Sequence, residues 1–344
     1  MRRARLAAAV LVVAALAGAG CGEKSEPTGD SGGPREPFTV ILDYLPNADH
    51  AGIYAAQAKG LYAQAGLDVK LVVPPDASAP LKLLRAGRAD VAISYEPELL
   101  LARDAGAENL VSVAALVQEP LTSLMALPSA RIHSAKDLAG KRVGTAGIAY
   151  QHAYLQTILQ HAGVDPGSVK ETDVGFNLVP ALVSKKVDAT LGAYWNYEGI
   201  QLARAQRHPV ILRMPQLGVP TYDELVVVAR HESLDTAGAS RLRRFLSATA
   251  AGYRSLRTDP GTAVDALAQA SHGIDKGLQD ASIKATLPAF FPRDTANPWG
   301  WQDVTAWARY ERWMRANRLL TRPPSEAPPL TNEFLAGRGT GAAR

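Results

Sequence analysis

The chain has 344 residues, 47% of them hydrophobic and 20% charged, which is enough to build about two ordinary domains with full cores. This composition excludes a wholly disordered chain, a collagen-like repeat and a small disulfide-stabilised protein. The net charge of +4 includes three arginines within the first five residues, and no cluster of Lys and Arg follows, so no nucleic-acid partner is predicted.

Residues 1–20 are predicted to be a secretory signal peptide. Residues 1–5 carry the positive charges, and residues 6–20 are an apolar run shorter than the roughly 20 residues that span a bilayer. Small residues then lead to Cys21, the only cysteine, which excludes a disulfide within the chain. The segment resembles a bacterial lipobox, although Gly18 stands where Leu is usual. The alternative is an ordinary signal peptide with an incidental cysteine.

The lipobox resemblance implies that Cys21 is lipidated and that the protein is exported and anchored to the outer face of the cell membrane. Residues 22–36 mix Gly, Ser, Pro and charges without apolar periodicity, so we expect residues 21–36 to form the lipidated cysteine and a flexible tether.

From residue 38 onward the pattern alternates between apolar strands and helices. In a first set we expect strands at 38–44, 69–73, 91–94 and 110–116, with helices at 53–65, 79–86 and 97–105. In a second set we expect strands at 141–146, 169–174, 189–194, 210–214 and 224–229, with helices at 150–162 and 179–185. Helices are then expected at 237–257, 261–269, 276–287 and 302–316. This order predicts an α/β protein with mostly parallel sheets.

The two sets predict two α/β lobes joined by a hinge of two crossings. The proline-containing stretches 124–130 and 219–226 are the expected crossings, so lobe 1 would comprise 37–127 and 222–322, and lobe 2 would comprise 128–221. The proline- and glycine-rich residues 323–344 are expected to be a flexible tail. A ligand would bind between the lobes, at the carboxyl ends of the strands.

Sequence motifs for covalent or metal catalysis are absent from the chain, and its seven histidines lack metal-ligand spacing. We therefore expect no catalytic residue, no metal and no cofactor. The turn from Gly144 to Gly147 follows a strand and precedes a helix, so it is either a tight turn or an anion cradle, and Gly147 is a candidate ligand contact.

Aromatic and polar side chains gather just past the predicted strand ends. The candidate ligand-binding residues are, besides Gly147, Tyr44, Asn47, His50, Tyr95, Glu96, Phe176, Asn177, Tyr194, Trp195, Asn196 and Glu198. Aromatic rings can stack on a flat ligand, and the carboxylates and amides can bond its edge. Because these segments contain no Arg, they suit a neutral or weakly cationic heteroaromatic better than an anion. The alternative is that the rings are rim packing and the amides are helix caps.

Five segments together resemble the NMT1/THI5-like family over about residues 37–230. They are DYLPNADHAGIYAA (43–56), KGLYAQAGLDV (59–69), GRADVAISYEP (87–97), VGFNLVPAL (174–182) and VDATLGAYWNYE (187–198). The resemblance implies the type II periplasmic binding protein fold. It also implies a monomeric solute-binding lipoprotein that delivers a thiamine pyrimidine precursor, hydroxymethylpyrimidine or formylaminopyrimidine, to an ABC permease.

The family's D-W-x-P-N-x-x-H motif matches Asp43 to His50, with Tyr44 in place of the usual Trp. Its N-Y-E motif matches residues 196–198, which implies that Glu198 bonds the pyrimidine. Fungal members are enzymes that make the pyrimidine phosphate and use a histidine matched here by His50 together with a cysteine cluster, whereas no cysteine follows Cys21.

Three alternatives to pyrimidine binding follow from these residues. Some family relatives are assigned to riboflavin, whose ring system also suits an aromatic sandwich. An exported pyrimidine-processing enzyme with His50 or Glu96 as the base is a second alternative. A sulfonate ligand is disfavoured because the strand ends carry no Arg.

Overall fold

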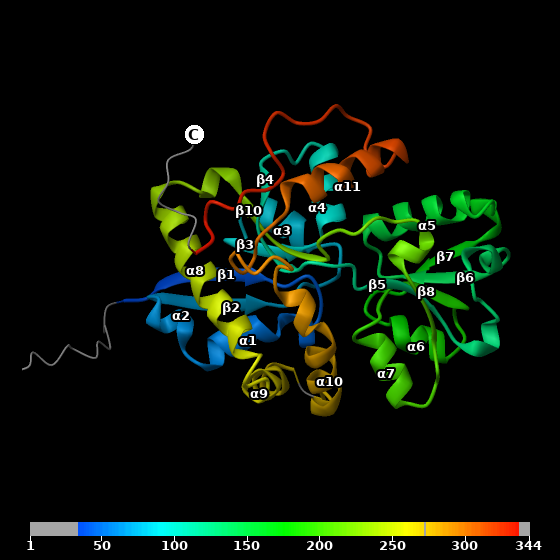
Figure 1. The fold of residues 1–344 in the computed structure, drawn as a ribbon, viewed down its shortest axis with the longest axis horizontal. Helices are drawn as coiled ribbons and strands as arrows, with labels where there is room; N and C mark the ends of the chain where they lie inside the picture. The colour runs from blue at the N-terminus through cyan, green and yellow to red at the C-terminus, as the bar shows by residue number, and fades with distance from the viewer. Residues whose placement is uncertain (1–33, 272, 337–344) are drawn as a thin grey trace, which may run out of the picture. The chain divides into compact units, whose positions relative to one another are not determined.

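The computed structural model describes residues 34–271 and 273–336, and within them the chain builds two five-stranded sheets (Figure 1). The predicted signal peptide, Cys21 and most of the tether lie outside the described residues. No described helix is long and apolar enough to cross a membrane, and no described group of His, Cys, Asp and Glu is arranged to hold a metal ion.

The first sheet has the order β2-β1-β3-β10-β4. Its strands are β1 (Glu36–Ile41), β2 (Leu67–Val72), β3 (Val91–Ser94), β4 (Leu110–Val117) and β10 (Leu225–Arg230). Strand β1 pairs in parallel with β2 and β3, whereas β10 is antiparallel to both β3 and β4. The mostly parallel sheet that was predicted is therefore confirmed, with one antiparallel strand inserted near its edge.

The second sheet has the order β7-β6-β8-β5-β9 and the same plan. Its strands are β5 (Thr122–Ala126), β6 (Arg142–Thr145), β7 (Lys170–Asp173), β8 (Ala189–Tyr194) and β9 (Val210–Arg213). Strand β6 is parallel to β7 and β8, and β5 is antiparallel to β8 and β9. In each sheet the antiparallel strand is the first that the chain forms after it crosses over.

The helices divide between the sheets, and we call each sheet with its helices a lobe. The first lobe holds α1 (Ala51–Ala58), α2 (Leu61–Gln64), α3 (Pro80–Arg85), α4 (Glu96–Asp104), α8 (Thr236–Ser255), α9 (Gly261–Ala270), α10 (Lys276–Thr286) and α11 (Val304–Ala316). The second lobe holds α5 (Ala149–His161), α6 (Leu178–Val183) and α7 (Glu198–Arg204). Phe38 of β1 stacks on Phe245 of α8 at 4.7 Å between ring centroids, which joins sheet and helix in the core.

Helices α1 and α8 approach closely because each has a glycine at the contact. A Cβ built on Gly252 would lie 2.1 Å from the Gly52 carbonyl oxygen, and one built on Gly52 would lie 2.1 Å from the Tyr253 ring. No side chain fits at either position, because Gly252 packs against the α1 backbone and Gly52 packs against the Tyr253 ring.

The crossings between the sheets differ in part from the expected ones. Residues 122–126 belong to the second sheet as β5, so the first crossing is residues 118–121 and precedes the stretch 124–130 that was expected to cross. Pro128, which the sequence suggests as part of the crossing, only begins a short turn after β5. The return passes between Arg213 and Leu225.

The expectation of a flexible tail from residue 323 is wrong for its described part. Leu330, Phe334 and Leu335 are buried, and the Leu330 backbone bridges Ser112 of β4. The amides of Ser112, Ala115 and Gln118 donate to carbonyls of Pro329, Gly300 and Ala289, so late segments of the chain lie along the outer edge of β4. Four of the seven residues 323–329 are prolines, and this composition did not indicate that the apolar residues after them would pack on the sheet.

Candidate functional site

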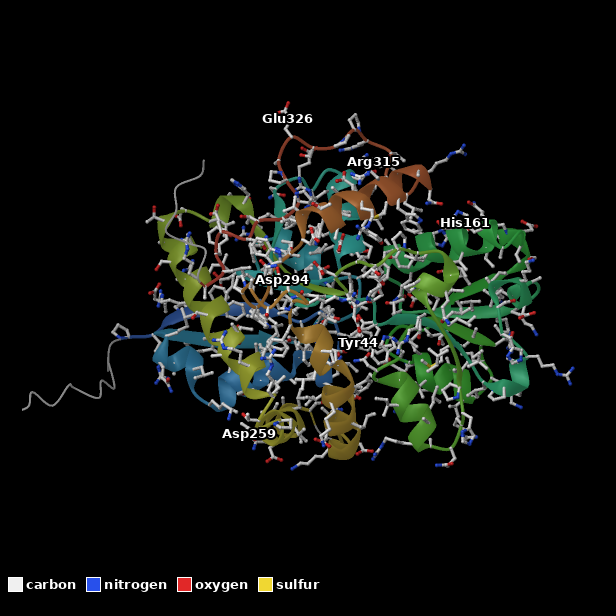
Figure 2. All side chains as sticks on the ribbon, in the orientation of Figure 1. Tyr44, His161, Asp259, Asp294, Arg315 and Glu326 are labelled. Carbon is white, nitrogen blue, oxygen red and sulfur yellow. The ribbon has the colours of Figure 1, made fainter. Side chains whose placement is uncertain are left out.

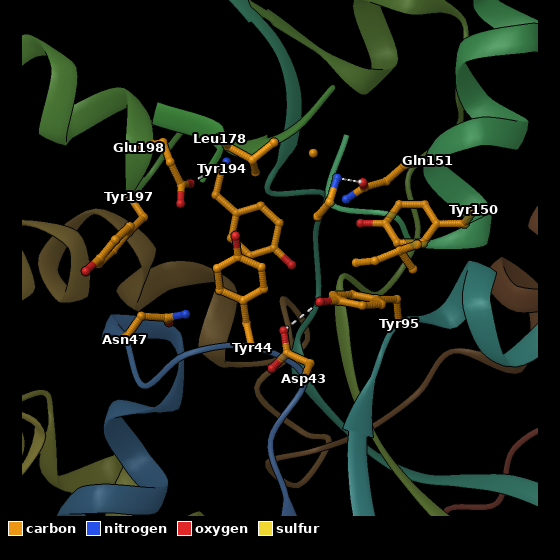
Figure 3. A pocket seen from close by; sticks show the side chains of 13 residues that line it. Asp43, Tyr44, Asn47, Tyr95, Tyr150, Gln151, Leu178, Tyr194, Tyr197 and Glu198 are labelled. Atoms are coloured by element: carbon orange, nitrogen blue, oxygen red, sulfur yellow. Dashed lines mark hydrogen bonds between the residues drawn. The ribbon is translucent and has the colours of Figure 1, made fainter. Parts of the chain in front are cut away.

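A pocket opens where strands of both sheets end, as expected for parallel strands (Figure 3). It holds about 370 Å³ of empty space, including solvent at its mouth. The lining residues lie in or follow β8, follow β1, β3 and β6, or begin α5, α6 and α7: Asp43, Tyr44, Asn47, Tyr95, Ala146, Ile148, Tyr150, Gln151, Leu178, Gly192, Tyr194, Tyr197 and Glu198. Figure 2 places Tyr44 at the junction of the two lobes.

Five tyrosines and two carboxylates give the pocket its chemistry. Among the described residues that line it there is no Lys, Arg or His. Tyrosine rings offer flat apolar faces with polar tips, and the carboxylates Asp43 and Glu198 offer acceptors to a donor-rich or cationic ligand. The pocket lacks the positive groups that an anionic ligand needs.

Glu198 begins α7, directly after the loop that follows β8. Its Oε2 accepts the Tyr194 backbone N–H at 2.7 Å, which fixes the carboxyl group beside the pocket. Burial raises the pKa of Glu198 to about 7, although the bond from Tyr194 lowers it. The group therefore changes its protonation near neutral pH.

Asp43 is held at the pocket floor by two partners on its two oxygens. The Tyr95 hydroxyl donates to Oδ2 at 2.7 Å, and His50 Nε2 lies 2.7 Å from Oδ1. Because His50 Nδ1 accepts the Asn47 N–H at 3.3 Å, the ring proton is on Nε2 and is donated to Asp43. His50 is fully buried and supports Asp43 without lining the pocket.

Replacing Tyr95 by phenylalanine is expected to lower the free energy of unfolding by about 2 kcal/mol, because a buried Asp43 oxygen loses its donor. Urea unfolding measures this change. Tyr54→Phe is the control: Tyr54 is equally buried, and its hydroxyl makes no hydrogen bond within the described residues. Equal losses in the two variants would contradict the role given to the Tyr95 hydroxyl.

The second lobe contributes an aromatic and amide wall that the sequence reasoning missed. Tyr150 lies 5.1 Å from Tyr95 between ring centroids, across the two lobes. Gln151 Oε1 accepts the Ala146 N–H at 2.7 Å, and a Cβ on Gly192 (φ +117°) would lie 2.3 Å from the Gln151 amide. Gly192 is thus required for Gln151 to reach the pocket wall.

Of the twelve predicted ligand-binding residues, the structure brings Tyr44, Asn47, Tyr95, Tyr194 and Glu198 into the pocket lining. Their binding role stays a prediction. Asn47 also serves the local turn, because its Oδ1 accepts the Asp49 N–H at 2.8 Å and its Nδ2 donates to the Leu45 carbonyl.

The other predicted positions do not line the pocket. Phe176 packs edge-on against Tyr44 at 4.6 Å, and Asn177 is exposed at the start of α6. Trp195 donates to the Pro120 carbonyl. Gly147 (φ +75°) forms a tight turn in which a Cβ would lie 2.5 Å from Asp173.

Glu96 and Asn196 are buried and bonded elsewhere. Glu96 accepts the Asp223 N–H at 2.7 Å and lines a different cavity, and Asn196 reaches Asp49 in the other lobe. Tyr197, the middle residue of the N-Y-E motif, was not among the predicted ligand-binding residues. It lines the pocket, whereas Glu96 and Asn196 do not.

The sequence profile of the NMT1/THI5-like family matches residues 47–263 of this chain. The chain belongs to the NMT1/THI5-like family. The family resemblance inferred from the sequence is thereby confirmed.

Two relatives of this chain have names that describe different activities, one a binding protein and one an enzyme. The formylaminopyrimidine-binding protein of Halalkalibacterium halodurans is 32% identical over 84% of this chain and 87% of its own length. The 4-amino-5-hydroxymethyl-2-methylpyrimidine phosphate synthase of Legionella pneumophila is 28% identical over 86% of this chain and 92% of its own length.

Solved structures with low identity share the fold of this NMT1/THI5-like chain. A Candida albicans protein described as having the generic periplasmic binding protein fold has a TM-score of 0.62 at 18% identity, over 84% of this chain and 92% of its own. The alkanesulfonate-binding protein SsuA from Xanthomonas axonopodis pv. citri has a TM-score of 0.65 at 19% identity, over 87% of this chain and 99% of its own. The predicted periplasmic binding protein fold is confirmed.

Proposed function

We propose that this chain is a solute-binding protein that takes an unphosphorylated thiamine pyrimidine precursor into the pocket and delivers it to an ABC permease. The observation that carries the proposal is the pairing of Glu198 with tyrosine rings in a pocket whose described lining has no cation. An aminopyrimidine is flat, has an amino donor beside a ring nitrogen acceptor, and carries no negative charge. The name of the Halalkalibacterium relative supports this class of ligand.

The pocket lining disfavours binding of a pyrimidine phosphate, the compound that appears in the name of the Legionella relative. A pyrimidine phosphate would bring negative charge beside Asp43 and Glu198, and the described lining has no Lys or Arg to receive it. His50, the candidate base of an enzyme, is buried and bonded on both ring nitrogens. A sulfonate meets the same obstacle as a phosphate.

Isothermal titration of the purified protein with hydroxymethylpyrimidine and formylaminopyrimidine tests the proposal. We expect one-to-one binding with a Kd below about 10 µM, or roughly −7 kcal/mol. Riboflavin and the pyrimidine phosphate are the comparison ligands and are expected to bind at least tenfold more weakly. Absence of measurable binding by both unphosphorylated pyrimidines would overturn the proposal.

Recovery of the bound pyrimidine separates transport binding from catalysis. Mass spectrometry is expected to return the ligand unchanged after prolonged incubation with the protein. A new product at the expense of the pyrimidine would instead show that the protein is an enzyme.

A further inference from the structure

Beside the pocket, a buried polar contact joins the two lobes. Asn196, in the loop between β8 and α7, donates from Nδ2 to Asp49 Oδ1 at 2.8 Å and to Thr286 Oγ1 at 2.6 Å. Asp49 lies in the short 3-10 turn Ala48–His50 of the first lobe, and Thr286 ends α10. All three side chains are fully buried.

One oxygen on each side of this contact lacks a partner. Asp49 Oδ2 and Asn196 Oδ1 are both buried without a hydrogen bond among the described residues. If Asp49 is ionised, both atoms are acceptors only and cannot bond each other. If Asp49 carries a proton on Oδ2, that proton can be donated to Asn196 Oδ1, and two parallel bonds then join acid and amide.

The surroundings of Asp49 favour its protonated form. Burial raises the pKa of Asp49 well above its usual value, the bond from Asn196 lowers it, and the nearby carboxylates of Asp43, Glu198 and Glu224 raise it further. His50, on the same turn, is the nearest basic group in sequence, and its ring is bonded to Asp43. The Tyr253 hydroxyl of α8 donates to the Asp49 backbone carbonyl and leaves the carboxyl group untouched.

The same loop is held a second time by α10. Gln279 Nε2 donates to the Tyr197 hydroxyl at 2.8 Å. Residues 197 and 198 both line the pocket, so the segment that supplies Tyr197 and Glu198 is bonded to the first lobe at adjacent positions.

We propose that Asp49 and Asn196 are positioning residues whose acid–amide pair latches the second lobe to the first and so holds Tyr197 and Glu198 in place around the ligand. The ligand part of this inference rests on the proposed function. The lobe-closing part does not.

The latch makes lobe closure dependent on pH. In an opened molecule Asp49 is solvated and its pKa returns toward the ordinary value, so closing takes up a proton whenever the pH lies between the two values. The closed-to-open ratio is then expected to fall with rising pH in that window, by at most about tenfold per pH unit.

Distance measurement between spin labels on the two lobes tests the latch without ligand. Labels are placed by K70C on β2 and K170C on β7, both exposed, in the full chain with Cys21→Ser so that no other cysteine is present. Asp49→Ala and Asn196→Ala are expected to lengthen the distance at every pH. Asp49→Asn keeps both bonds because its amide donates where the acid did, so it should retain the short distance and lose the pH dependence that Asp49 confers.

Asp259→Asn is the matched control, because Asp259 is a surface carboxylate paired with Lys59 far from the lobe junction (Figure 2). It should leave both the distance and its pH dependence unchanged. The latch is overturned if Asp49→Asn opens the lobes as far as Asp49→Ala does, or if its pH profile matches that of the unmodified chain.

Measurements of pyrimidine affinity then test whether the latch positions the pocket. Asp49→Ala is expected to raise the Kd for the pyrimidine about tenfold, mainly through faster release, and Asp49→Asn by less than about twofold. If no variant binds a pyrimidine, the proposed function fails while the label distances still decide the latch. If Asp49→Ala opens the lobes without changing the Kd, the latch does not position the site.

Discussion

Replacing Glu198 by alanine is expected to weaken pyrimidine binding by about 1.5–3 kcal/mol, or roughly 10- to 150-fold in Kd. The loss is expected because Glu198, at the start of α7, is one of the two acidic side chains that line the pocket and can bond the amino group of the pyrimidine. Isothermal titration against the unmodified protein measures the change. An affinity unchanged within twofold would remove Glu198 from the binding site.

The protonation of Glu198 gives this prediction a second readout. An aminopyrimidine edge presents one donor and one acceptor, and a protonated carboxyl group complements both, whereas a carboxylate complements only the amino group. Because the pKa of Glu198 is about 7 in the structure, the contribution of Glu198 to pyrimidine affinity should be level below pH 7. It should fall by up to about tenfold per pH unit above pH 7, since binding then requires proton uptake.

Glu198→Gln is the matched variant for this pH profile. Its amide also offers one donor and one acceptor at every pH, so it should bind within about 1 kcal/mol of the unmodified protein. Its affinity should fall less above pH 7, and titrating groups other than residue 198 cancel in the comparison. An unchanged slope in Glu198→Gln would show that the pH dependence arises elsewhere.

Gly252→Ala is expected to lower the free energy of unfolding by about 3 kcal/mol, the largest effect on stability that we predict for a single methyl group. The added Cβ would lie 2.1 Å from the Gly52 carbonyl oxygen, a backbone atom that cannot rotate away, so α1 and α8 must separate. Urea unfolding with a two-state fit measures the loss.

Gly261→Ala at the start of α9 controls for the general effect of alanine in a helix. There the new Cβ would meet only Asp259 Oδ1, at an ordinary 3.7 Å. This variant should be neutral or slightly stabilising. Similar losses at the two positions would show that the close approach of α1 and α8 has no special cost.

The sequence predicted the pocket best where a side chain directly follows a strand. Tyr95 and Tyr194 lie at the ends of β3 and β8, and chain geometry alone brings such positions to the same edge. Beyond the strand end, successive loop residues turn in different directions, so the choice among Trp195, Asn196 and Tyr197 depends on tertiary partners that no local pattern reveals.

Tyr150 and Gln151 were missed for a related reason. They lie in the first turn of α5, which is separated from β6 by three residues, and the first turn of such a helix lies at the same edge of the sheet as the end of the strand before it. That rule could have found them. Glu96 could not have been placed, because its partner Asp223 is brought to it by the packing of a distant segment. His50 instead bonds Asp43 within the same turn between β1 and α1, and the local sequence does not show that its ring turns toward Asp43 and away from the pocket.

The late segments that run along β4 have a consequence for how this protein behaves in concentrated solution. A sheet that ends in a row of free amides invites a strand from another molecule to add to it. Here the amides of Ser112, Ala115 and Gln118 already donate to carbonyls from residues 289–329 of the same chain. These backbone donors on the outer edge of β4 are therefore not available to a strand from a neighbouring molecule. Loss of residues 329–335 would free the Ser112 amide and expose it to intermolecular strand addition.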